Sequence, residues 1–489
     1  MSGALPILIG GPFAAAMVSF LFTGAIGRAL SVLLATASAV AALATSIEVM
    51  RSGVQIHALA GWGAPLGIEL RIDGLAMLML LLTAGISLAV TTFAAGYLKG
   101  DAQPHFWPLW YFLWGALNTV FLVSDIFSLY VCLELITLAA VGGTALSGDR
   151  IALSASLRYL MSAIMGSLAY LLGVAMIYAQ VGTLDLTQLS GRLGSSWSSG
   201  AALSLVTAGL AMKTALFPLH FWLPAAHSLA PAPISAALSA MVVKASFYVL
   251  LRFWFQLSEP TSNQLAAHLL GALGMAAVLW GSVQAALQER LKLVVAYSTV
   301  AQIGYLFFIF PLFGGALAAG RSEWAQEAWK GGIILILAHA VAKSAMFLVS
   351  GALLQTFGSD RISDLKGAAV RAPLTLAAWG IAGISLIGLP PSGGFIAKWL
   401  LLTTAIRQEY WLYVAVLLLG GLLASVYVFR VLWHSFLTPE EMPSVSRIPG
   451  SMSISILALT VVLLLMGLRP AIPLEFTLIG IPLPAGDLR

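Results

Sequence analysis

The sequence predicts an all-α polytopic membrane protein of about fourteen transmembrane helices. Of its 489 residues, 60% are hydrophobic and only 9% are charged, whereas about a quarter of the residues of a soluble globular protein are charged. A hydrocarbon layer about 30 Å thick needs about 20 apolar residues per helix, and such runs fill the sequence almost from end to end. Prolines interrupt two of these runs. We therefore expect a multi-pass protein of a bacterial-type inner (plasma) membrane.

Apolar runs between charged or Pro- and Gly-rich breaks mark the expected helices. They lie near residues 4–24, 29–47, 74–96, 107–123, 126–146, 157–179, 201–222, 233–256, 264–286, 292–313, 331–355, 374–402, 411–433 and 451–468. The first run has no basic region before it and no small-residue cleavage site, so we expect it to be a retained span and not a signal peptide. An even number of spans places both ends of the chain on one side of the membrane.

The basic residues indicate which side that is, because cytoplasmic loops collect Lys and Arg. With both ends outside, the inner loops hold eleven of the 24 basic residues, Lys292 among them, and the outer loops hold nine, Arg252 among them. This distribution favours both ends outside. The remaining basic residues, 24 − 11 − 9 = 4, have no loop in which to lie.

Five charged residues are embedded in the apolar runs and are not assigned to loops. They are Glu134, Lys213, Lys244, Lys343 and Lys398. A charge at the bilayer centre costs at least about 2.5 to 3.5 kcal/mol on insertion scales, so such residues face the interior of a bundle, pair, or become neutral. A buried lysine whose carboxylate partner moves can alternate between holding and releasing a proton. The set therefore predicts a proton relay.

Structural roles for the same residues stay open at this point. A lone lysine in a span can extend to the membrane surface or simply join two helices. Lys343 follows His339 by four residues on one helical face, so its alternative to a relay role is to tune that histidine. His339 itself is either a structural hydrogen-bonding residue or a relay group whose unperturbed pKa lies near neutrality.

Two expected spans are broken near a lysine. Pro218 follows Lys213, and Pro390 and Pro391 precede Lys398. Proline removes a backbone donor, and non-helical backbone at membrane depth persists only where protein or water satisfies it. Paired interruptions in two halves of a chain are typical of transporters built from inverted repeats. The two breaks therefore indicate an ion path, although the lysine precedes the proline in one and follows it in the other.

Other functions find no support in the sequence. Cys132 is the only cysteine, which excludes an iron–sulfur cluster held by four thiolates and any internal disulfide. We find no nucleotide loop, metal-ligand cluster or activated nucleophile, and His220 and His227 lack a third ligand, so we expect no catalytic centre, cofactor or metal in this chain. The net charge of +5 is not concentrated in a block, so we expect no nucleic-acid partner. Asp125 either caps the fifth helix or gathers cations at its entrance.

Five segments of the sequence resemble one family. Residues 217–244, FPLHFWLPAAHSLAPAPISAALSAMVVK, are similar to the PLHxWLPxAHxxAPxPxSAxL run of the antiporter-like proton-conducting subunits of respiratory complex I, multi-subunit cation/proton antiporters and membrane-bound hydrogenases. Four more segments follow the family in order: SDIFSLYVCLE (124–134), LKLVVAYSTVAQIGY (291–305), AHAVAKSAMF (338–347) and GLPPSGGFIAKW (388–399). The resemblance covers residues 70–440 and departs from many relatives at Ala225 and Leu229.

This resemblance implies an architecture and roles for single residues. It implies two inverted five-helix repeats, at 101–256 and 257–434, with three flanking helices at 1–100 and a final helix and short tail at 435–489. Glu134 resembles the fifth-helix glutamate that pairs with the seventh-helix lysine, here Lys213. Lys244 resembles the central eighth-helix lysine, and His339 the eleventh-helix relay residue. Lys398 lies where the twelfth-helix exit residue is lysine in some branches and glutamate in others.

The resemblance also implies a function within a larger assembly. We expect a proton-translocating subunit that works in the bilayer beside other membrane subunits, as the D-type subunit of a cation/proton antiporter that moves protons and, in exchange, a cation such as Na⁺. The alternatives are a proton-pumping subunit of a redox-driven translocase of the complex I or hydrogenase type, a proton-coupled subunit of a bicarbonate uptake system, and a membrane scaffold whose charges only hold helices together.

Overall fold

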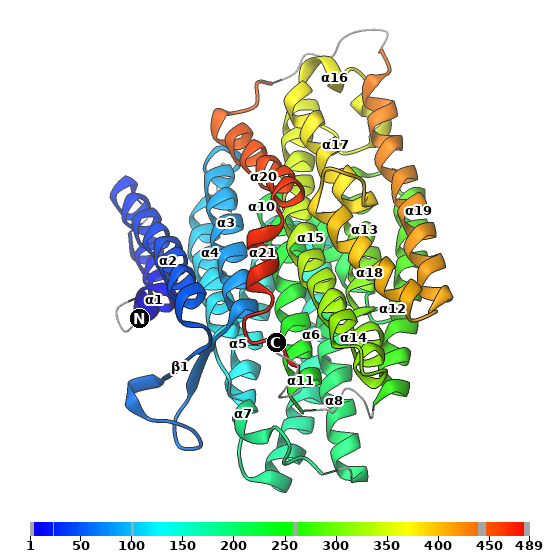
Figure 1. Cartoon of the computed structure of the whole chain (residues 1–489). Coiled ribbons are helices and arrows are strands. Elements are labelled where there is room, and N and C mark those ends of the chain that lie inside the picture. Colours follow the sequence, from blue (N-terminus) through cyan, green and yellow to red (C-terminus); the bar gives the residue numbers. More distant parts are fainter. Residues whose placement is uncertain are drawn as a thin grey trace.

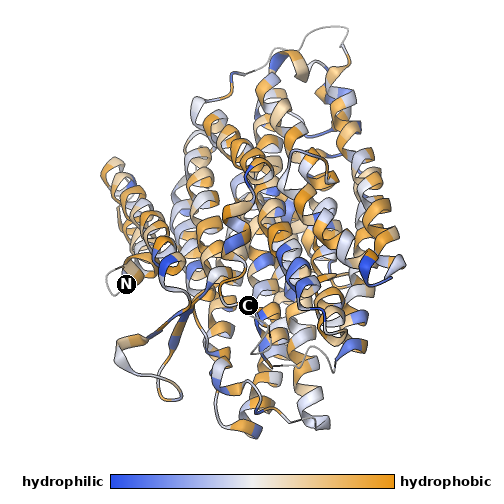
Figure 2. Cartoon of the chain, viewed as in Figure 1, coloured by the Kyte–Doolittle hydropathy of each residue, from blue (hydrophilic) through white to orange (hydrophobic). Residues whose placement is uncertain are grey.

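The computed structural model describes residues 4–22, 24–98, 102–194, 196–257, 263–438 and 446–483. These residues form a bundle of long, roughly aligned helices, from which one short β-hairpin projects (Figure 1). Hydrophobic residues dominate the length of the helices, and hydrophilic residues gather on the hairpin strands and at the connections (Figure 2). The all-α prediction is therefore confirmed for the bundle, and it missed the hairpin.

The first half of the chain supplies the elements on the hairpin side and the first broken helix. They are α1 Ala4–Leu21, α2 Ala25–Ser52, β1 Gln55–Ala58, the 3₁₀ turn η1 Leu59–Gly61, β2 Glu69–Ile72, α3 Gly74–Tyr97, α4 Ala102–Val120, α5 Ile126–Ala145, α6 Arg150–Val181, α7 Leu186–Leu189, α8 Trp197–Thr214, α9 Leu223–Leu229, α10 Ala232–Ala237, the π-helical turn η2 Leu238–Val242 and α11 Val243–Leu257.

The second half contains the longest helix and the second broken helix. Its elements are α12 Gln264–Leu287, α13 Leu291–Leu306, α14 Ile309–Ala318, α15 Ser322–Phe357, the 3₁₀ turn η3 Ile362–Leu365, α16 Ala368–Arg371, α17 Pro373–Ile387, α18 Gly393–Arg407, α19 Trp411–Phe436, α20 Gly450–Leu468 and α21 Ala471–Phe476.

Within the described residues, eleven helical segments are long and apolar enough to cross a membrane. Each coincides with one of the expected spans. The other three expected spans fall on the aromatic-rich α4, on α8 of the interrupted pair α8–α9, and on both helices of the interrupted pair α17–α18. The breaks leave each helix of these two pairs shorter than the roughly 20 residues of a simple span. The count of fourteen crossings, the inverted repeats and the division of the chain at 100, 256 and 434 stay predictions.

Aspartates begin several of the helices. The Asp125 carboxylate accepts a hydrogen bond of 2.6 Å from the Ser128 amide and so caps α5, which is the structural alternative for this residue. Asp73 caps α3 and also accepts two bonds of 2.6 Å from Arg252 in the second half of α11. This buried, bidentate pair joins the start of α3 to α11.

The centre of the bundle consists of α10–η2–α11 and α15. The most apolar 18-residue window of each is entirely buried, whereas less than half of the equivalent window in α1, α2, α12 or α19 is buried. The outer helices therefore expose large apolar side chains, as expected for contact with lipid. Three of the predicted relay residues lie on the two central segments: Lys244 on α11, and His339 and Lys343 on α15.

Glycines allow α6 and α8 to pack closely. A methyl group added at Gly166 would lie 2.9 Å from the Gly209 carbonyl oxygen, and one added at Gly209 would lie 2.8 Å from the Tyr170 amide nitrogen. Backbone atoms cannot yield as a side chain can, so both positions require the absence of a side chain. This contact holds α8, which carries Lys213, against α6.

Gly209→Val is therefore expected to destabilise the protein by about 1 to 3 kcal/mol through overpacking. Gly200→Val is the matched control, because it lies on the same helix and an added methyl group there meets nothing within 4 Å. The measurement is the midpoint of thermal unfolding of each purified variant in mild detergent. Equal midpoints for the two variants would contradict the close contact of α6 with α8.

Candidate functional site

Glu134 and Lys213 form an ion pair between α5 and α8. The Lys213 Nζ lies 2.9 Å from Glu134 Oε1 and 3.3 Å from Thr137 Oγ1. The Ser167 hydroxyl of α6 donates a hydrogen bond to the same glutamate oxygen. The Lys213 side chain is 6% exposed and that of Glu134 is 25% exposed. The acid thus lies at the edge of the bundle, less deeply than the sequence suggests, and pairs with a lysine that points inward.

The lysine of this pair lies at the end of a helix. Lys213 is in the last turn of α8, and Ala215 ends the helix with a φ of 58° in the left-handed region. Pro218 lies in the non-helical stretch that follows. The Trp222 indole beyond the break donates to the Met212 carbonyl at 3.1 Å. A cation is favoured at this position because carbonyl groups converge at the C-terminus of a helix.

Polar groups continue from Lys213 toward α11. The Thr214 hydroxyl bonds Ser246 on α11 at 3.2 Å. A small cavity beside the ion pair is lined by Lys213, Thr137, Tyr159 and Ser246, together with apolar side chains. These groups connect the ion pair with the central helix that carries the next lysine.

Lys244 lies immediately after the π-helical turn η2. Its ammonium group donates to the Ser239 carbonyl within that turn, and the Ser239 hydroxyl is bonded to Thr299 on α13 at 2.8 Å. A π-turn leaves a carbonyl oxygen without its usual helical partner, and such turns occur frequently at functional sites. The turn thus provides a buried acceptor for Lys244 where the described residues offer no carboxylate.

Lys343 and His339 lie one turn apart on α15 but have different surroundings. The Lys343 Nζ donates to the Val295 carbonyl at 3.1 Å and to the Ser298 hydroxyl at 2.5 Å, both on α13. His339 is 1% exposed, and neither ring nitrogen bonds to any described residue. A role for His339 as a structural hydrogen-bonding residue therefore has no support among these contacts. Both nitrogens are available for a proton or a water molecule.

Lys398 binds the end of the helix before it. Its Nζ donates to the Leu386 carbonyl at 2.7 Å and to the Ile387 carbonyl at 3.3 Å, at the C-terminus of α17. It also lies 4.3 Å from the centre of the Tyr305 ring, a cation–π contact. The Gln302 side chain of α13 donates to the same Leu386 oxygen at 3.0 Å. The carbonyl oxygens of Leu386 and Ile387 and the ring of Tyr305 all favour a positive charge on Lys398.

The two helix breaks are more alike than the sequence suggests. Pro390 and Pro391 lie between α17 and α18, and Ser392 then caps α18 by accepting a bond of 3.1 Å from the Phe395 amide. Lys398 reaches back from α18 to the C-terminus of α17. In both breaks, therefore, a lysine occupies the C-terminal end of the first half-helix, although the lysine and the proline occur in opposite order.

The scarcity of acidic partners limits how many of the four buried lysines can be protonated at once. Among the described residues, Lys213 is the only one of the four lysines with an acidic partner. The penalty for an unpaired buried ion is several kcal/mol even after relaxation. Four full charges at once would therefore be costly.

The structure corrects two of the loop assignments. Lys292 is 5% exposed, and its Nζ donates to the Ala230 carbonyl at 2.7 Å at the end of α9. Arg252 is 8% exposed in its pair with Asp73. Lys292 is the second residue of α13 and Arg252 lies five residues before the end of α11, and near helix ends hydropathy alone does not separate a surface residue from a buried one. The comparison of Lys and Arg in the loops on the two sides is therefore a weaker indicator of how the chain is oriented in the membrane.

Sequence reasoning missed His227 as a member of the buried polar set. It is fully buried on α9, it lies against the Phe347 ring at 5.8 Å between ring centres, and neither nitrogen bonds to a described residue. From the sequence it was weighed only as a metal ligand together with His220. The sequence feature that could have identified His227 is its position shortly after the first helix break.

Comparison with known proteins assigns the family. Residues 123–424 match the family model described as "NADH:quinone oxidoreductase/Mrp antiporter, TM", and residues 63–107 match "NADH-Ubiquinone oxidoreductase (complex I), chain 5 N-terminus". The chain belongs to the NADH:quinone oxidoreductase/Mrp antiporter family of membrane subunits. The resemblance found in the five sequence segments is thereby confirmed.

Two curated relatives are similar to the chain over most of its length. The N subunit of NADH-quinone oxidoreductase from Desulforudis audaxviator is 35% identical over 450 residues, which is 87% of each chain. The D-type subunit of the Na(+)/H(+) antiporter from Alkalihalophilus pseudofirmus is 28% identical over 442 residues, which is 88% of this chain and 86% of the relative.

Solved structures show the same fold in three kinds of complex. A chain of an archaeal membrane-bound sulfane sulfur reductase superposes with a TM-score of 0.88 at 26% identity, over 98% of this chain and 96% of that chain. A chain of the Mrp complex from Dietzia gives 0.88 at 24% identity, with the same two coverages. A chain of respiratory complex I from Thermus thermophilus gives 0.85 at 24% identity, over 97% of this chain and 98% of that chain.

Proposed function

We propose that this chain is a proton-translocating membrane subunit of a multi-subunit complex, and that the buried lysines with Glu134 and His339 are its proton path. The Glu134–Lys213 ion pair at the first helix break is the observation that carries this proposal. The named relatives are subunits of an oxidoreductase and of an antiporter. A shared proton path is the function that both assignments have in common.

The contacts of the lysines support an order of steps. When Lys213 is held by Glu134, its charge is neutralised and a proton on Lys244 is tolerated. When the pair opens, the free Lys213 ammonium repels a charge on Lys244, so the proton leaves toward Lys343 and His339 on α15. The final acceptor is Lys398 at the second break. Water entering the breaks at Pro218 and at Pro390 and Pro391 would join these groups.

The energy source is proposed to be an existing ion gradient, as in the D-type subunit of a cation/proton antiporter. Two relatives named as D-type subunits of an Na(+)/H(+) antiporter align over 80 to 88% of this chain. The redox-driven alternative has an observation of its own, because the relative at 35% identity is an NADH-quinone oxidoreductase subunit. Both alternatives use the same internal path.

Glu134→Gln tests the path. The amide keeps the shape of the side chain but removes the charge that holds Lys213, so proton transport should fall at least tenfold, which corresponds to about 1.4 kcal/mol in the barrier. The measurement is proton uptake, followed with a pH-sensitive dye, in membrane vesicles from cells that make the chain with its native partners.

Glu327→Gln is the matched control for this test, because Glu327 forms an exposed ion pair with Arg407 away from the buried set. It should transport normally. If Glu134→Gln also transports normally while the complex assembles, the relay is wrong and the charges are a scaffold.

The identity of the partners distinguishes the two energy sources. The complex is purified in mild detergent through this chain, and the co-purifying proteins are identified by mass spectrometry. A gradient-driven antiporter should contain only membrane subunits without redox centres. Flavin- or metal-cluster-bearing subunits at equal stoichiometry would overturn the antiporter assignment in favour of a redox-driven pump.

A further inference from the structure

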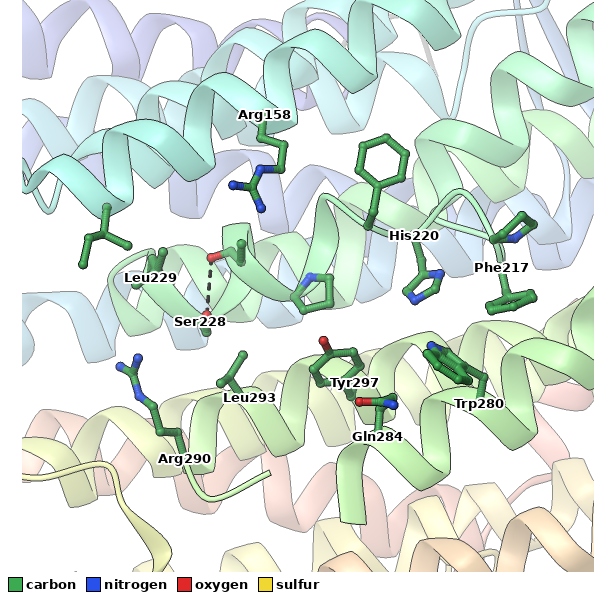
Figure 3. A pocket seen from close by; sticks show the side chains of 15 residues that line it. Arg158, Phe217, His220, Ser228, Leu229, Trp280, Gln284, Arg290, Leu293 and Tyr297 are labelled. Carbon is green, nitrogen blue, oxygen red and sulfur yellow. Dashed lines mark hydrogen bonds between the residues drawn. The ribbon is translucent and has the colours of Figure 1, made fainter. Parts of the chain in front are cut away.

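A groove on the side of the bundle contains none of the proposed relay residues but borders the first helix break at Pro218. Its volume is about 510 Å³, and it is bounded by α6, by the segment 217–229, and by α12 and α13 (Figure 3). The volume falls within the range of about 300 to 1,000 Å³ that is typical of sites for small ligands. Since Arg158 and Arg290 on opposite walls are both exposed, the groove is open to the surroundings of the bundle.

One end of the groove is basic. Arg158 lies eight residues after the start of α6, and its guanidinium makes no hydrogen bond or ion pair that is defined among the described residues. Arg290 immediately precedes α13 and binds Asp360 through Nε at 3.0 and 3.1 Å. Its two terminal nitrogens have no such bond to a described residue. In Figure 3 the two arginines extend from opposite walls toward the same end of the groove. No Asp or Glu is among its lining residues.

The other end of the groove is aromatic. Phe217 and Trp280 line it there, and Phe221 is a further aromatic lining residue of the groove. Phe221 is 51% exposed and Trp280 is 47% exposed. Figure 3 shows Phe217 and Trp280 at the end opposite to Arg158 and Arg290. His220 lies beside them, with a buried Nδ1 that has no partner among the described residues.

The ligand that matches this arrangement has an anionic head and an apolar tail. A phosphate between two guanidinium groups is bound by strong, charge-assisted hydrogen bonds. An acyl chain that starts at the arginines would lie along the aromatic end. A soluble anion would leave the aromatic half unused, and the groove is small for a helix of a partner protein. Basic pockets between transmembrane helices are known to receive the headgroups of anionic lipids.

We propose that this groove binds one anionic phospholipid, with its phosphate between Arg158 and Arg290 and one acyl chain against Phe217 and Trp280. The bound lipid rests on the segment 217–229, which follows Lys213 directly. The lipid therefore contacts the first helix break from outside. This inference concerns binding and does not depend on the proposed function.

The test measures the binding of phosphatidylglycerol to the purified complex by native mass spectrometry after delipidation in detergent. The wild type should retain phosphatidylglycerol in preference to phosphatidylcholine, and Arg158→Gln with Arg290→Gln should weaken this binding at least tenfold. Arg371→Gln is the charge control, because Arg371 ends α16, lies outside the groove and loses one positive charge, as each of the two substitutions does. It should bind as the wild type does.

A phosphatidylglycerol with a photoreactive acyl chain locates the tail. Cross-links to peptides that contain Phe217, Phe221 or Trp280, lost in the double variant, support the proposal. Equal binding by the double variant overturns it, as do cross-links elsewhere on the chain or to a partner subunit in the groove. Displacement by millimolar inorganic phosphate would identify an anion site without a lipid and also overturns it.

If the double variant does not fold, Arg158→Gln alone serves, because that side chain makes no defined hydrogen bond or ion pair with a described residue.

Discussion

An ammonium group inside a membrane needs oxygen atoms to accept its hydrogen bonds, and a regular helix offers only the second lone pair of carbonyls that already accept one bond. The structure supplies these oxygens where helices are irregular. Lys398 binds the carbonyls at the end of α17, Lys244 binds a carbonyl of the π-helical turn η2, and Lys213 lies at the end of α8 beside Glu134. Lys343 is the exception, since it uses Val295 and Ser298 of an intact α13. The helix breaks and the π-helical turn therefore supply hydrogen-bond acceptors that the buried lysines need.

This constraint also explains why the set suits proton transfer. Neutral acceptors such as carbonyls and hydroxyls bind an ammonium group and a neutral amine with a much smaller difference in energy than a carboxylate does. The lysines bound by carbonyls can therefore lose their protons more readily than the one bound by Glu134. One ion pair at the edge of the bundle can then control the charge of the interior, because charges interact strongly where water is excluded.

Much of this site could be predicted from the sequence, because charge in an apolar run is conspicuous. This signal identified the four lysines Lys213, Lys244, Lys343 and Lys398. The prolines at both breaks were identified because they interrupt apolar runs. The acceptors could not be predicted, since the carbonyl that binds each lysine depends on tertiary packing, and the π-turn at Leu238–Val242 has no proline or glycine to mark it. Burial of Lys292 and Arg252 was missed for a related reason, because a charged residue at a helix end appears the same in sequence whether it faces water or a neighbouring helix.

We propose that Lys244, which has no acidic partner among the described residues, carries the translocated proton. The most direct measurement is proton flux in proteoliposomes that contain the intact complex with Lys244→Gln, compared with the wild type at equal assembly. We expect a loss of flux of at least tenfold, with Glu134 and Lys213 unchanged, because a glutamine side chain cannot gain and release a proton as a lysine can. Flux at the wild-type level would show that protons pass by another route.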